Sequence, residues 1–385
     1  MSLARLAVVG NDRQLHQVRL DGSSTQLTLS LASNPLLLWG QPSLQLASWS
    51  WPTWSPDGRR LACFELPDGD DVSGPARVHV LEDDGVSQRN LLELSGRIPI
   101  YLSWRPDGAG LAVLMQDEEE LVLGYVAIDT LGKLRIIEEG VPLFFTWGPD
   151  RRRLLVHSAT GIAGRVAIRD SEGRLPDQVL PQPPGSYCAP VVVGERVVHV
   201  ERKSGTNALI STDVDGEQSR SLLEFEGLGA VVPVDERRVI FAAAPAGEGS
   251  PYRGATLVDI VSGELTRLHD EESLAFFWST EGQQLLYARV EAQDQCLAWC
   301  SVRPSESTVK LCQFIPSREM LFYLHFFDQF VHSHRLVSPD GRHLVFAGHR
   351  PDARSGPPQI WVKDLRTELP AKPLADGCFA CFSPA

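Results

Sequence analysis

The sequence predicts an all-β protein, an eight-bladed β-propeller made of four-stranded antiparallel blades. The first observation is the stretch WSPDGRRLACFE from Trp54, which recurs as SWRPDGAGLAVLM from Ser103, TWGPDRRRLLVHS from Thr146 and RLVSPDGRHLVFA from Arg335. The second is the spacing of the copies, because periods near 40 to 50 residues are typical of propeller blades. The third is that the segments between copies read as strands and show no helical periodicity, which argues against alternating β and α units.

Each copy reads as a β-hairpin. In S-P-D-G, Pro fixes φ at the second turn position, Asp accepts hydrogen bonds from the backbone that follows it, and Gly accepts a left-handed conformation. The run from Arg60 to Phe64 then alternates polar and apolar residues as a strand does. A tight turn therefore joins the first two strands of each blade.

Eight degenerate copies align with one another along the chain. With Trp54 as the reference, the equivalent positions are Trp104, Trp147, Pro190, Val232, Trp278, Val337 and Phe382. After each hairpin comes a third strand that ends in a polar turn, such as RVHVLEDDG or LISTDVDG, and then a fourth short run, such as RNLLEL or RSLLEF. Four strands in each of eight units give the expected blade count.

The two ends of the chain complete one blade. The C-terminal run CFACFSPA supplies an inner strand and the start of a turn, and the strand that should follow is found in MSLARLAVVG at the N-terminus. LHQVRLDG and TQLTLSL then supply the third and fourth strands. We therefore expect pairing of the N- and C-terminal strands to close the ring, with residues 1–385 forming a single propeller domain that carries an aromatic-rich loop insertion at about 317–332.

Composition excludes several classes of partner. Lys and Arg number 36 against 49 Asp and Glu, a formal net charge of −13, whereas proteins that bind a phosphate backbone need a basic surface. No apolar stretch reaches the roughly 18 residues of a membrane-spanning helix, and no signal peptide is recognisable. We expect no nucleic-acid binding, no membrane insertion and a cytoplasmic protein, or a periplasmic or extracellular one if a signal peptide has been removed.

The W-S-P-D-G-R-R-L-A pattern resembles the repeat of TolB-type β-propellers, which also occurs in the propeller domains of prolyl oligopeptidase-like peptidases. The segment FFDQFVHSHRLVSPDGRHLVFAG is similar to a feature of uncharacterised bacterial TolB-like proteins. The resemblance implies the propeller fold and leaves function open, because such propellers act as scaffolds, binding platforms and gates. The peptidases also need a G-x-S-x-G nucleophile elbow, which this sequence lacks.

Two motifs hint at metal binding, and both are weak. His332 and His334 lie near Asp328, and Cys378 and Cys381 form a single C-x-x-C. Structural zinc sites usually take four ligands, and two cysteines at this spacing on a strand point to opposite faces. We expect packed thiols and loop histidines, with no metal and no cofactor.

The best candidate site is a ring of residues three places before each reference position. These are Trp51, Tyr101, Phe144, Tyr187, Gly229, Ala275, His334 and Phe379. Because the first strand of a blade is innermost, they should meet near one mouth of the central channel, with a gap at Gly229 and Ala275. They could equally be wedges between blades. The apolar insertion before His334 should lie at the same mouth, as a lid or as a patch for a partner.

These observations favour a non-catalytic binding or scaffolding propeller that recognises a protein or peptide at the channel mouth. The expected site residues are Trp51, Tyr101, Phe144, Tyr187, His334, Arg335 and Phe379. One alternative is a hydrolase or lyase that uses His334, Arg335 and Asp328, which requires the three side chains to converge. Another is a sensor of small molecules or glycans, which requires an open cavity inside the aromatic ring.

Overall fold

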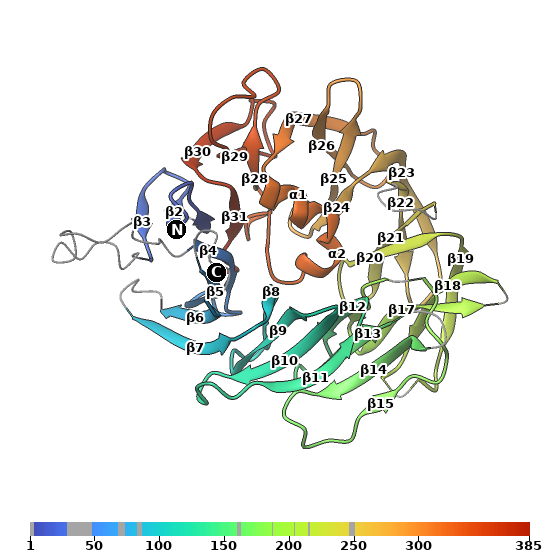
Figure 1. Cartoon of the computed structure of the whole chain (residues 1–385). Coiled ribbons are helices and arrows are strands. Elements are labelled where there is room, and N and C mark those ends of the chain that lie inside the picture. Colours follow the sequence, from blue (N-terminus) through green and yellow to red (C-terminus); the bar gives the residue numbers. More distant parts are fainter. Residues whose placement is uncertain are drawn as a thin grey trace.

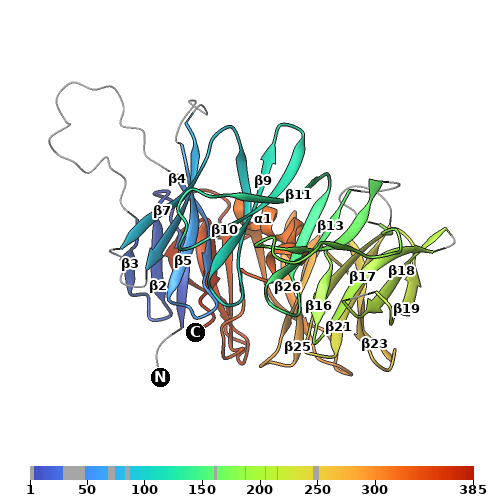
Figure 2. The ribbon, with the colours of Figure 1, turned by 90° about the horizontal axis from the view of Figure 1, so that it is seen from below.

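The computed structural model describes residues 4–28, 48–67, 74–82, 87–159, 163–186, 188–203, 205–214, 216–245 and 251–385. Antiparallel sheets are arranged in a ring around a central axis, with two short helices near that axis (Figure 1). Seen from the side, the ring is a squat cylinder whose innermost strands run close to its axis (Figure 2). The predicted all-β propeller is confirmed.

Six of the sheets of the described chain have four strands, and each runs from an inner to an outer strand. The first three in chain order are β4 Ser48–Trp54, β5 Arg60–Leu66, β6 Ala76–Glu82 and β7 Gln88–Leu94; β8 Ile98–Trp104, β9 Gly110–Asp117, β10 Glu120–Ala127 and β11 Arg135–Gly140; and β12 Leu143–Trp147, β13 Arg153–Ser158, β14 Arg165–Asp170 and β15 Gln178–Val179. Two more are β16 Val191–Val193, β17 Arg196–Lys203, β18 Thr206–Thr212 and β19 Arg220–Phe225; and β20 Leu228–Pro233, β21 Arg238–Ala244, β22 Tyr252–Asp259 and β23 Leu265–Ser273.

The remaining large sheet has seven strands. Its members are β24 Ala275–Ser279, β25 Gln284–Glu291, β26 Cys296–Val302, β27 Val309–Pro316, β28 His343–His349, β29 Gln359–Asp364 and β30 Lys372–Asp376. Only two residue pairs join β27 to β28. Strands β28–β30 correspond to the seventh copy of the repeat, whose inner segment makes the single bridges Val337 to Leu344 and Arg335 to Phe382.

The sixth four-stranded sheet contains both ends of the chain. It consists of β1 Arg5–Val9, β2 Leu15–Arg19, β3 Ser24–Gln26 and the C-terminal strand β31 Phe379–Phe382. Strands β1 and β31 are antiparallel, from the pair Leu6 and Phe382 to the pair Val9 and Phe379, and they lie side by side in Figure 1. The predicted closure of the ring by the N- and C-terminal strands is confirmed.

The recurring Trp and Arg of the repeat join neighbouring sheets. The indole N–H of Trp104 donates to the carbonyl of Thr53 in the preceding sheet at 2.8 Å. Arg60 of that sheet lies over the Trp104 ring, 4.7 Å from its centre, and donates to the carbonyl of Gly108 in the next hairpin turn at 2.8 Å. A stacked guanidinium adds an attraction to the ring face. The repeat thus encodes the contact between blades as well as the hairpin within each.

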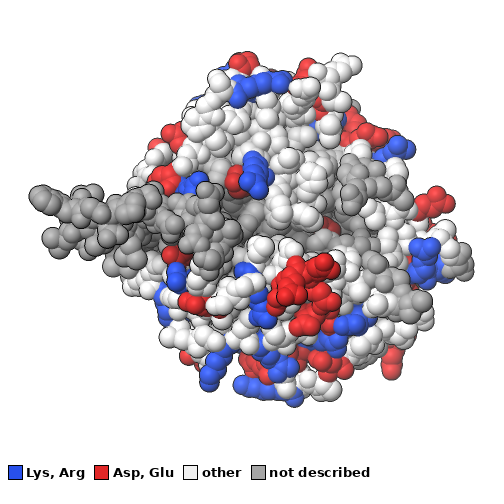
Figure 3. Space-filling model, viewed as in Figure 1, with Lys and Arg blue, Asp and Glu red and all other residues white. Residues whose placement is uncertain are grey.

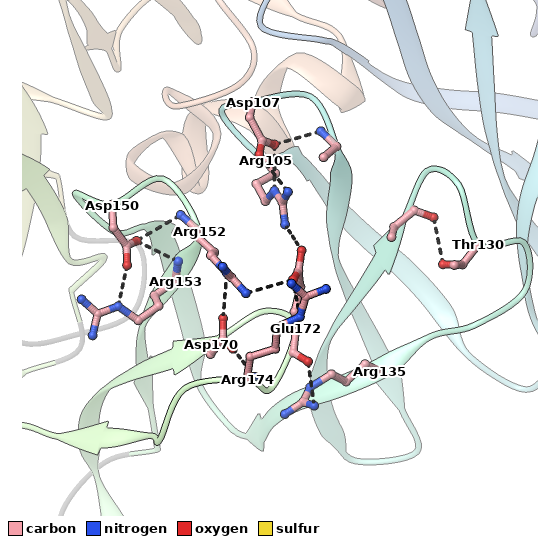
Figure 4. A network of polar contacts seen from close by, with 12 residues as sticks. Arg105, Asp107, Thr130, Arg135, Asp150, Arg152, Arg153, Asp170, Glu172 and Arg174 are labelled. Carbon is pink, nitrogen blue, oxygen red and sulfur yellow. Dashed lines mark hydrogen bonds and ion pairs between the residues drawn. The ribbon is translucent and has the colours of Figure 1, made fainter.

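The next junction uses other residues. In the next blade, Gly110 stands at the position of the repeat that Arg60 occupies. A Cβ atom on Gly110 would overlap the Tyr125 hydroxyl, so Tyr125 fills the space that an arginine side chain would need. Arg105 lies over the Tyr125 ring and donates to Glu172 in the neighbouring sheet at 2.7 Å. Glu172 also accepts from Arg152 at 3.0 Å (Figure 4). A polar network here replaces the repeated cation–ring contact.

The insertion at 317–332 differs from the expected loop. It forms α1 Arg318–His325 and α2 Phe327–Phe330, which lie inside the ring in Figures 1 and 2. The Ser317 hydroxyl caps α1 by accepting the backbone N–H of Met320 at 3.0 Å. Met320, Tyr323, Phe327 and Phe330 are fully or almost fully buried. The helices form because their apolar side chains can enter the channel, and we call residues 318–334 the plug.

Candidate binding site

The plug fills the predicted aromatic ring. The Phe330 ring centre lies 4.7 Å from that of Trp51, 4.9 Å from that of Tyr101 and 5.3 Å from that of His334. These separations are typical of favourable aromatic pairs. The inner strands therefore do bring part of the ring together, and a side chain of the same polypeptide occupies its centre.

The predicted site residues occupy three different environments. Tyr101 and Phe379 are buried beneath the plug, His334 is buried as the last residue of the plug itself, and Trp51 and Phe144 are half-buried at the edge of the plug. Arg335 lies beyond the plug, where it lines cavities at the opposite mouth rather than at the mouth of Trp51. Tyr187 lies outside the described residues. Whether any of them binds a ligand stays a prediction.

The expected gap in the ring is filled by α2. This helix contacts β12, β20 and β24, the last two of which contribute the small residues Gly229 and Ala275. The Phe327 ring lies there against Phe276, with ring centres 4.7 Å apart. The small residues thus leave the space that the helix occupies.

A chain of hydrogen bonds anchors the plug to the inner strands. The Tyr101 hydroxyl and the Ser333 hydroxyl are 2.7 Å apart, and Ser333 also contacts Nδ1 of His334 at 2.7 Å. Nε2 of His334 lies 3.1 Å from the Thr53 hydroxyl. Burial lowers the pKa of His334 to about 3, so its imidazole is neutral near pH 7. Both ring nitrogens thus have partners within the protein.

The residues of the enzyme alternative do not converge. Oδ1 of Asp328 accepts the backbone N–H of Gln329 at 3.1 Å, while His334 contacts Ser333 and Thr53. Within the described part of the chain, neither residue hydrogen-bonds the guanidinium of Arg335. Burial raises the pKa of Asp328 to about 6, and among the described residues its carboxylate makes no hydrogen bond with His334 or Arg335. A perturbed pKa without such partners does not define a catalytic site.

A groove remains open between the plug and the inner strands at the mouth of Trp51. It is a largely apolar cavity of about 800 Å³, and its walls come from β4, β8, β12 and α1. Its aromatic lining residues are Trp49, Trp51, Tyr101, Phe144, Phe322, Phe326, Phe330 and Phe379. Phe322 and Phe326 are 38% and 42% exposed. Exposed aromatic side chains in a concave apolar surface are typical of binding sites.

Trp51 is held in this groove by an unusual backbone. Its φ is +49°, a left-handed value that is an outlier for a bulky residue, and the pairing of β4 with β5 shifts register between Ser50 and Thr53. A β-bulge re-aims a side chain at the end of a sheet. Here the indole contacts Phe322, with ring centres 5.4 Å apart. Strained backbone of this kind is concentrated at functional sites.

Acidic side chains lie beside the groove. The turn between β9 and β10 carries Glu118, Glu119 and Glu120, all exposed, while the neighbouring Gln116 and Leu121 line the groove. Figure 3, viewed toward this mouth, shows a group of acidic side chains just below its centre. Asp117 is paired with Arg97 at 2.8 Å, and the groove lining itself carries Arg13, Arg318 and Glu319, so the three exposed glutamates add negative charge at its edge.

The metal-binding hints are not supported by the geometry. No cluster of three or more His, Cys, Asp or Glu suited to a metal ion occurs in the residues that the structure describes. The thiol of Cys381 donates to the carbonyl of Pro52 at 3.3 Å, whereas Cys378 faces Val9. Burial raises the pKa of Cys378 to about 12. Cys381 is buried and Cys378 is partly buried, and both thiols lie against backbone carbonyls.

Within the same described ranges, no helix is long and apolar enough to cross a membrane. The strands of the ring instead bury their apolar side chains between neighbouring sheets.

Comparison with known proteins gives the class of the fold. No protein-family model matches the chain, and no curated protein matches it. A prolyl endopeptidase structure matches with a TM-score of 0.58 and 15% identity, covering 87% of this chain and 50% of that one. Oligogalacturonate lyase from Vibrio parahaemolyticus matches with a TM-score of 0.50 and 12% identity, and the match covers 97% of this chain and 85% of the lyase. TolB from Acinetobacter baumannii matches with a TM-score of 0.39 and 14% identity, and the match covers 68% of this chain and 62% of TolB.

The chain therefore has the β-propeller fold, and the fold that the resemblance of its repeats implies is confirmed. It spans about half the length of the prolyl endopeptidase that it matches. Peptidases and a lyase share this architecture, so the fold alone does not select a function.

Two groove residues were absent from the predicted site. Phe322 and Phe326 were recognised only as apolar residues of a loop. Their spacing with Phe330, at intervals of four, places all three on one helical face, and Tyr323 and Phe327 repeat that interval on the next. This periodicity, with Ser317 as a capping residue, predicts a helix, but it does not show that Phe322 and Phe326 are exposed while Phe330, in the second helix, is buried.

Proposed function

We propose that this protein is a non-catalytic binding propeller that takes an extended segment of a partner protein into the groove beside its plug. The observation that carries the proposal is the open apolar groove of about 800 Å³, flanked by exposed aromatic side chains on a rigid ring. Phe322 and Phe326 remain exposed although neighbouring side chains of the plug are buried. A binding partner would remove this apolar surface from water.

The anchoring positions in the groove are Trp51, Phe144, Phe322 and Phe326. Aromatic anchors held on rigid elements lose little conformational entropy on binding, so they contribute strongly to affinity. Trp51 is positioned by the bulge in β4, and Phe322 and Phe326 pack against one another with ring centres 4.9 Å apart and the rings tilted by 51°. A leucine or aromatic side chain of the partner fits this lining.

The acidic turn defines the second feature of the partner. Glu118, Glu119 and Glu120 lie next to the groove, so lysine or arginine beside the apolar anchor would be attracted to them. Charge complementarity of this kind favours one partner over another and speeds encounter. The proposed occupant is therefore a peptide segment that combines a large apolar residue with flanking basic residues.

Fluorescence anisotropy with two labelled heptapeptides tests this function. One carries Leu-Trp followed by two lysines, and the other has glutamates in place of the lysines. We expect saturable binding of the lysine peptide, about tenfold tighter than that of the glutamate peptide at low salt. Binding of neither peptide would contradict the proposal.

Matched variants locate the binding. The double variant F322A/F326A should abolish binding of the lysine peptide, and its melting temperature should stay close to that of the wild type because both rings are exposed. Leu131→Ala serves as the control, since Leu131 is 59% exposed and does not line the groove. Undiminished binding by the double variant would place the site elsewhere.

A further inference from the structure

The channel continues on the other side of the plug, toward the S-P-D-G turns. A cavity of about 300 Å³ lies there beneath the inner-strand residues Thr53, Ser103 and Thr146. Trp54, Trp104 and Trp147 line it, and Gln329, His332 and Ser333 form its plug side. A second cavity of about 260 Å³, lined by Trp278, lies across the axis. Arg335 lines both cavities, which we together call the well, and the exposed Glu281 lines the second of them.

Arg335 carries a positive charge without a counter-ion in the described chain. Its carbonyl accepts the backbone N–H of Phe382 at 2.8 Å, but its guanidinium has no hydrogen bond or ion pair with any described residue. The side chain is open to the solvent of the well, yet the surrounding protein lowers the pKa of Arg335 through desolvation, with no carboxylate opposing that effect. An anion bound in the well would give this charge the partner that the described residues do not supply.

The nearby aspartates of the turns do not supply the missing negative charge. Asp57 accepts the Ser55 hydroxyl at 2.6 Å, and Asp340 accepts the Ser338 hydroxyl at 2.5 Å. Each also accepts a backbone N–H within its own turn. These carboxylates are therefore engaged in closing the hairpins.

The other unsatisfied groups that line the well can also donate hydrogen bonds. The indole N–H of Trp54 and that of Trp278 are buried without a partner among the described residues, and Trp54 is only 6% exposed. Nε2 of His332 is likewise buried and unpartnered. By contrast, the indoles of Trp104 and Trp147 donate to Thr53 and Ser103. These three donor atoms are buried within the walls, so the guanidinium of Arg335 is the donor that an acceptor in the well would meet.

We propose that this well binds a small organic acid, with its carboxylate on Arg335 and its apolar body against the proline and aromatic residues of the lining. One guanidinium matches a single negative charge, so a monoanion is better balanced there than a phosphate dianion. The tryptophan walls favour a flat apolar body, and the cavity limits its size. This site lies on the opposite side of the plug from the groove, and its argument does not depend on the proposed peptide function.

Calorimetric titration with phenylacetate tests the site, with phenylacetamide as the neutral analogue and inorganic phosphate as the dianion. We expect saturable binding of phenylacetate, binding at least about tenfold weaker for phenylacetamide, and weaker binding of phosphate. Equal binding of acid and amide, tighter binding of phosphate, or no binding of phenylacetate would overturn the assignment.

A second titration distinguishes a small acid from the C-terminal carboxylate of a peptide. It uses a tetrapeptide that ends in phenylalanine, once as the free acid and once as the amide. If the peptide acid binds and phenylacetate does not, the small-acid assignment is wrong.

Arg335→Gln identifies the residue responsible. It should weaken phenylacetate binding by at least about tenfold. Its melting temperature should equal or exceed that of the wild type, because the substitution removes an unpaired charge. Arg318→Gln, at an exposed arginine that lines the groove, is the control and should bind phenylacetate as the wild type does. Wild-type affinity in R335Q would refute the role of Arg335.

Discussion

The two mouths of the channel are formed by opposite ends of the same inner strands, and yet their chemistry differs. At one mouth the plug leaves an apolar groove next to a glutamate-rich turn. At the other mouth, tryptophans and hydroxyl side chains surround an unpaired arginine. The plug separates them, with Phe330 packed in the aromatic ring and Arg335 beyond it. One repeated scaffold can therefore present two unlike surfaces when an insertion divides its channel.

The difference follows from the parts of the repeat that each mouth uses. The mouth beyond the plug, on the side of Arg335, is made from the S-P-D-G turns and the tryptophans before them. These turns and tryptophans recur along the chain because they also join the blades. The mouth of Trp51 uses positions that those contacts leave free, such as Trp51 and Phe144, and the plug helix α1 forms part of its wall. Changes of residue at the mouth of Trp51 therefore leave the contacts between blades intact.

Opening the ring should remove both mouths. Deletion of residues 377–385 takes away β31, which pairs with β1 and whose Phe379 ring contacts Trp51. The loss should exceed the roughly 5–15 kcal/mol that stabilises a typical domain, so no cooperative thermal transition should remain. Deletion of only residues 384–385 spares the strand and is the control. A truncated protein with an unchanged melting temperature would contradict closure by β31.

Removing the centre of the plug should join the two mouths. Phe330→Ala deletes a 1%-exposed ring that contacts Trp51, Tyr101 and His334. The cavity left behind should lower the free energy of unfolding by about 3–5 kcal/mol. Phe326→Ala, at a 42%-exposed ring on the same face of the plug, should change it by only about 0.5 kcal/mol. Urea unfolding measures both, and equal effects would show that Phe330 is not part of the core.

Acid should loosen the plug. Burial lowers the pKa of His332 to about 4 and that of His334 to about 3, below the unfolded value near 6.5. Between those values the unfolded chain binds protons that the folded chain does not, so stability falls as pH drops from about 6.5 to 4. Asp328, whose pKa burial raises to about 6, acts in the opposite direction because the folded state takes up its proton first.

Two variants separate these opposing effects. Near pH 5, His334→Gln should flatten the fall in the free energy of unfolding by up to about 1.4 kcal/mol per pH unit, whereas Asp328→Asn should steepen it. Urea unfolding between pH 7.5 and 4.5 provides the slopes. If both variants changed the slope in the same direction, the burial described for these two groups would be wrong.

The smallest expected effect distinguishes two tryptophans of the repeat. Trp104→Phe removes the hydrogen bond to Thr53, whereas Trp54→Phe removes an indole N–H without a partner in the described chain. Both variants lose similar apolar area, so Trp104→Phe should be less stable by about 1 kcal/mol. Chemical denaturation of the pair measures the difference. A Trp54 variant that is the less stable of the two would show that its N–H has a partner.

The repeat predicted the blades and their closure because turn chemistry and strand alternation are local. The sequence of S-P-D-G turns placed the inner strands, and the incomplete copy at Phe379–Phe382 indicated its pairing with β1. The plug was harder to predict, since an apolar segment between strands can cover a channel, enter it or meet a partner. Phe322, Phe326 and Phe330 have the four-residue spacing of a helix, whereas the repeat pattern predicts only a loop for this segment.

The aromatic ring shows the limit of prediction from strand position. Register predicted that Trp51, Tyr101, His334 and Phe379 would approach one another, and ring contacts join Trp51, Tyr101 and Phe379 to His334. It could not show that Phe330 would lie among them, because that contact depends on the path of the insertion in three dimensions. Arg335, adjacent to His334 in sequence, lies beyond the plug for the same reason.

Amide hydrogen exchange tests the central claim, that residues 318–334 form a stable plug between two separate mouths. The backbone N–H groups of Phe330, Val331 and His334 donate to carbonyls within the plug at 3.1, 2.8 and 2.9 Å. If the plug opens only with the ring, these amides should be protected to the same order as those in the inner strand β8. Exchange at the rate of an exposed loop, while β8 stays protected, would show that the plug opens on its own and that the mouths are not separate.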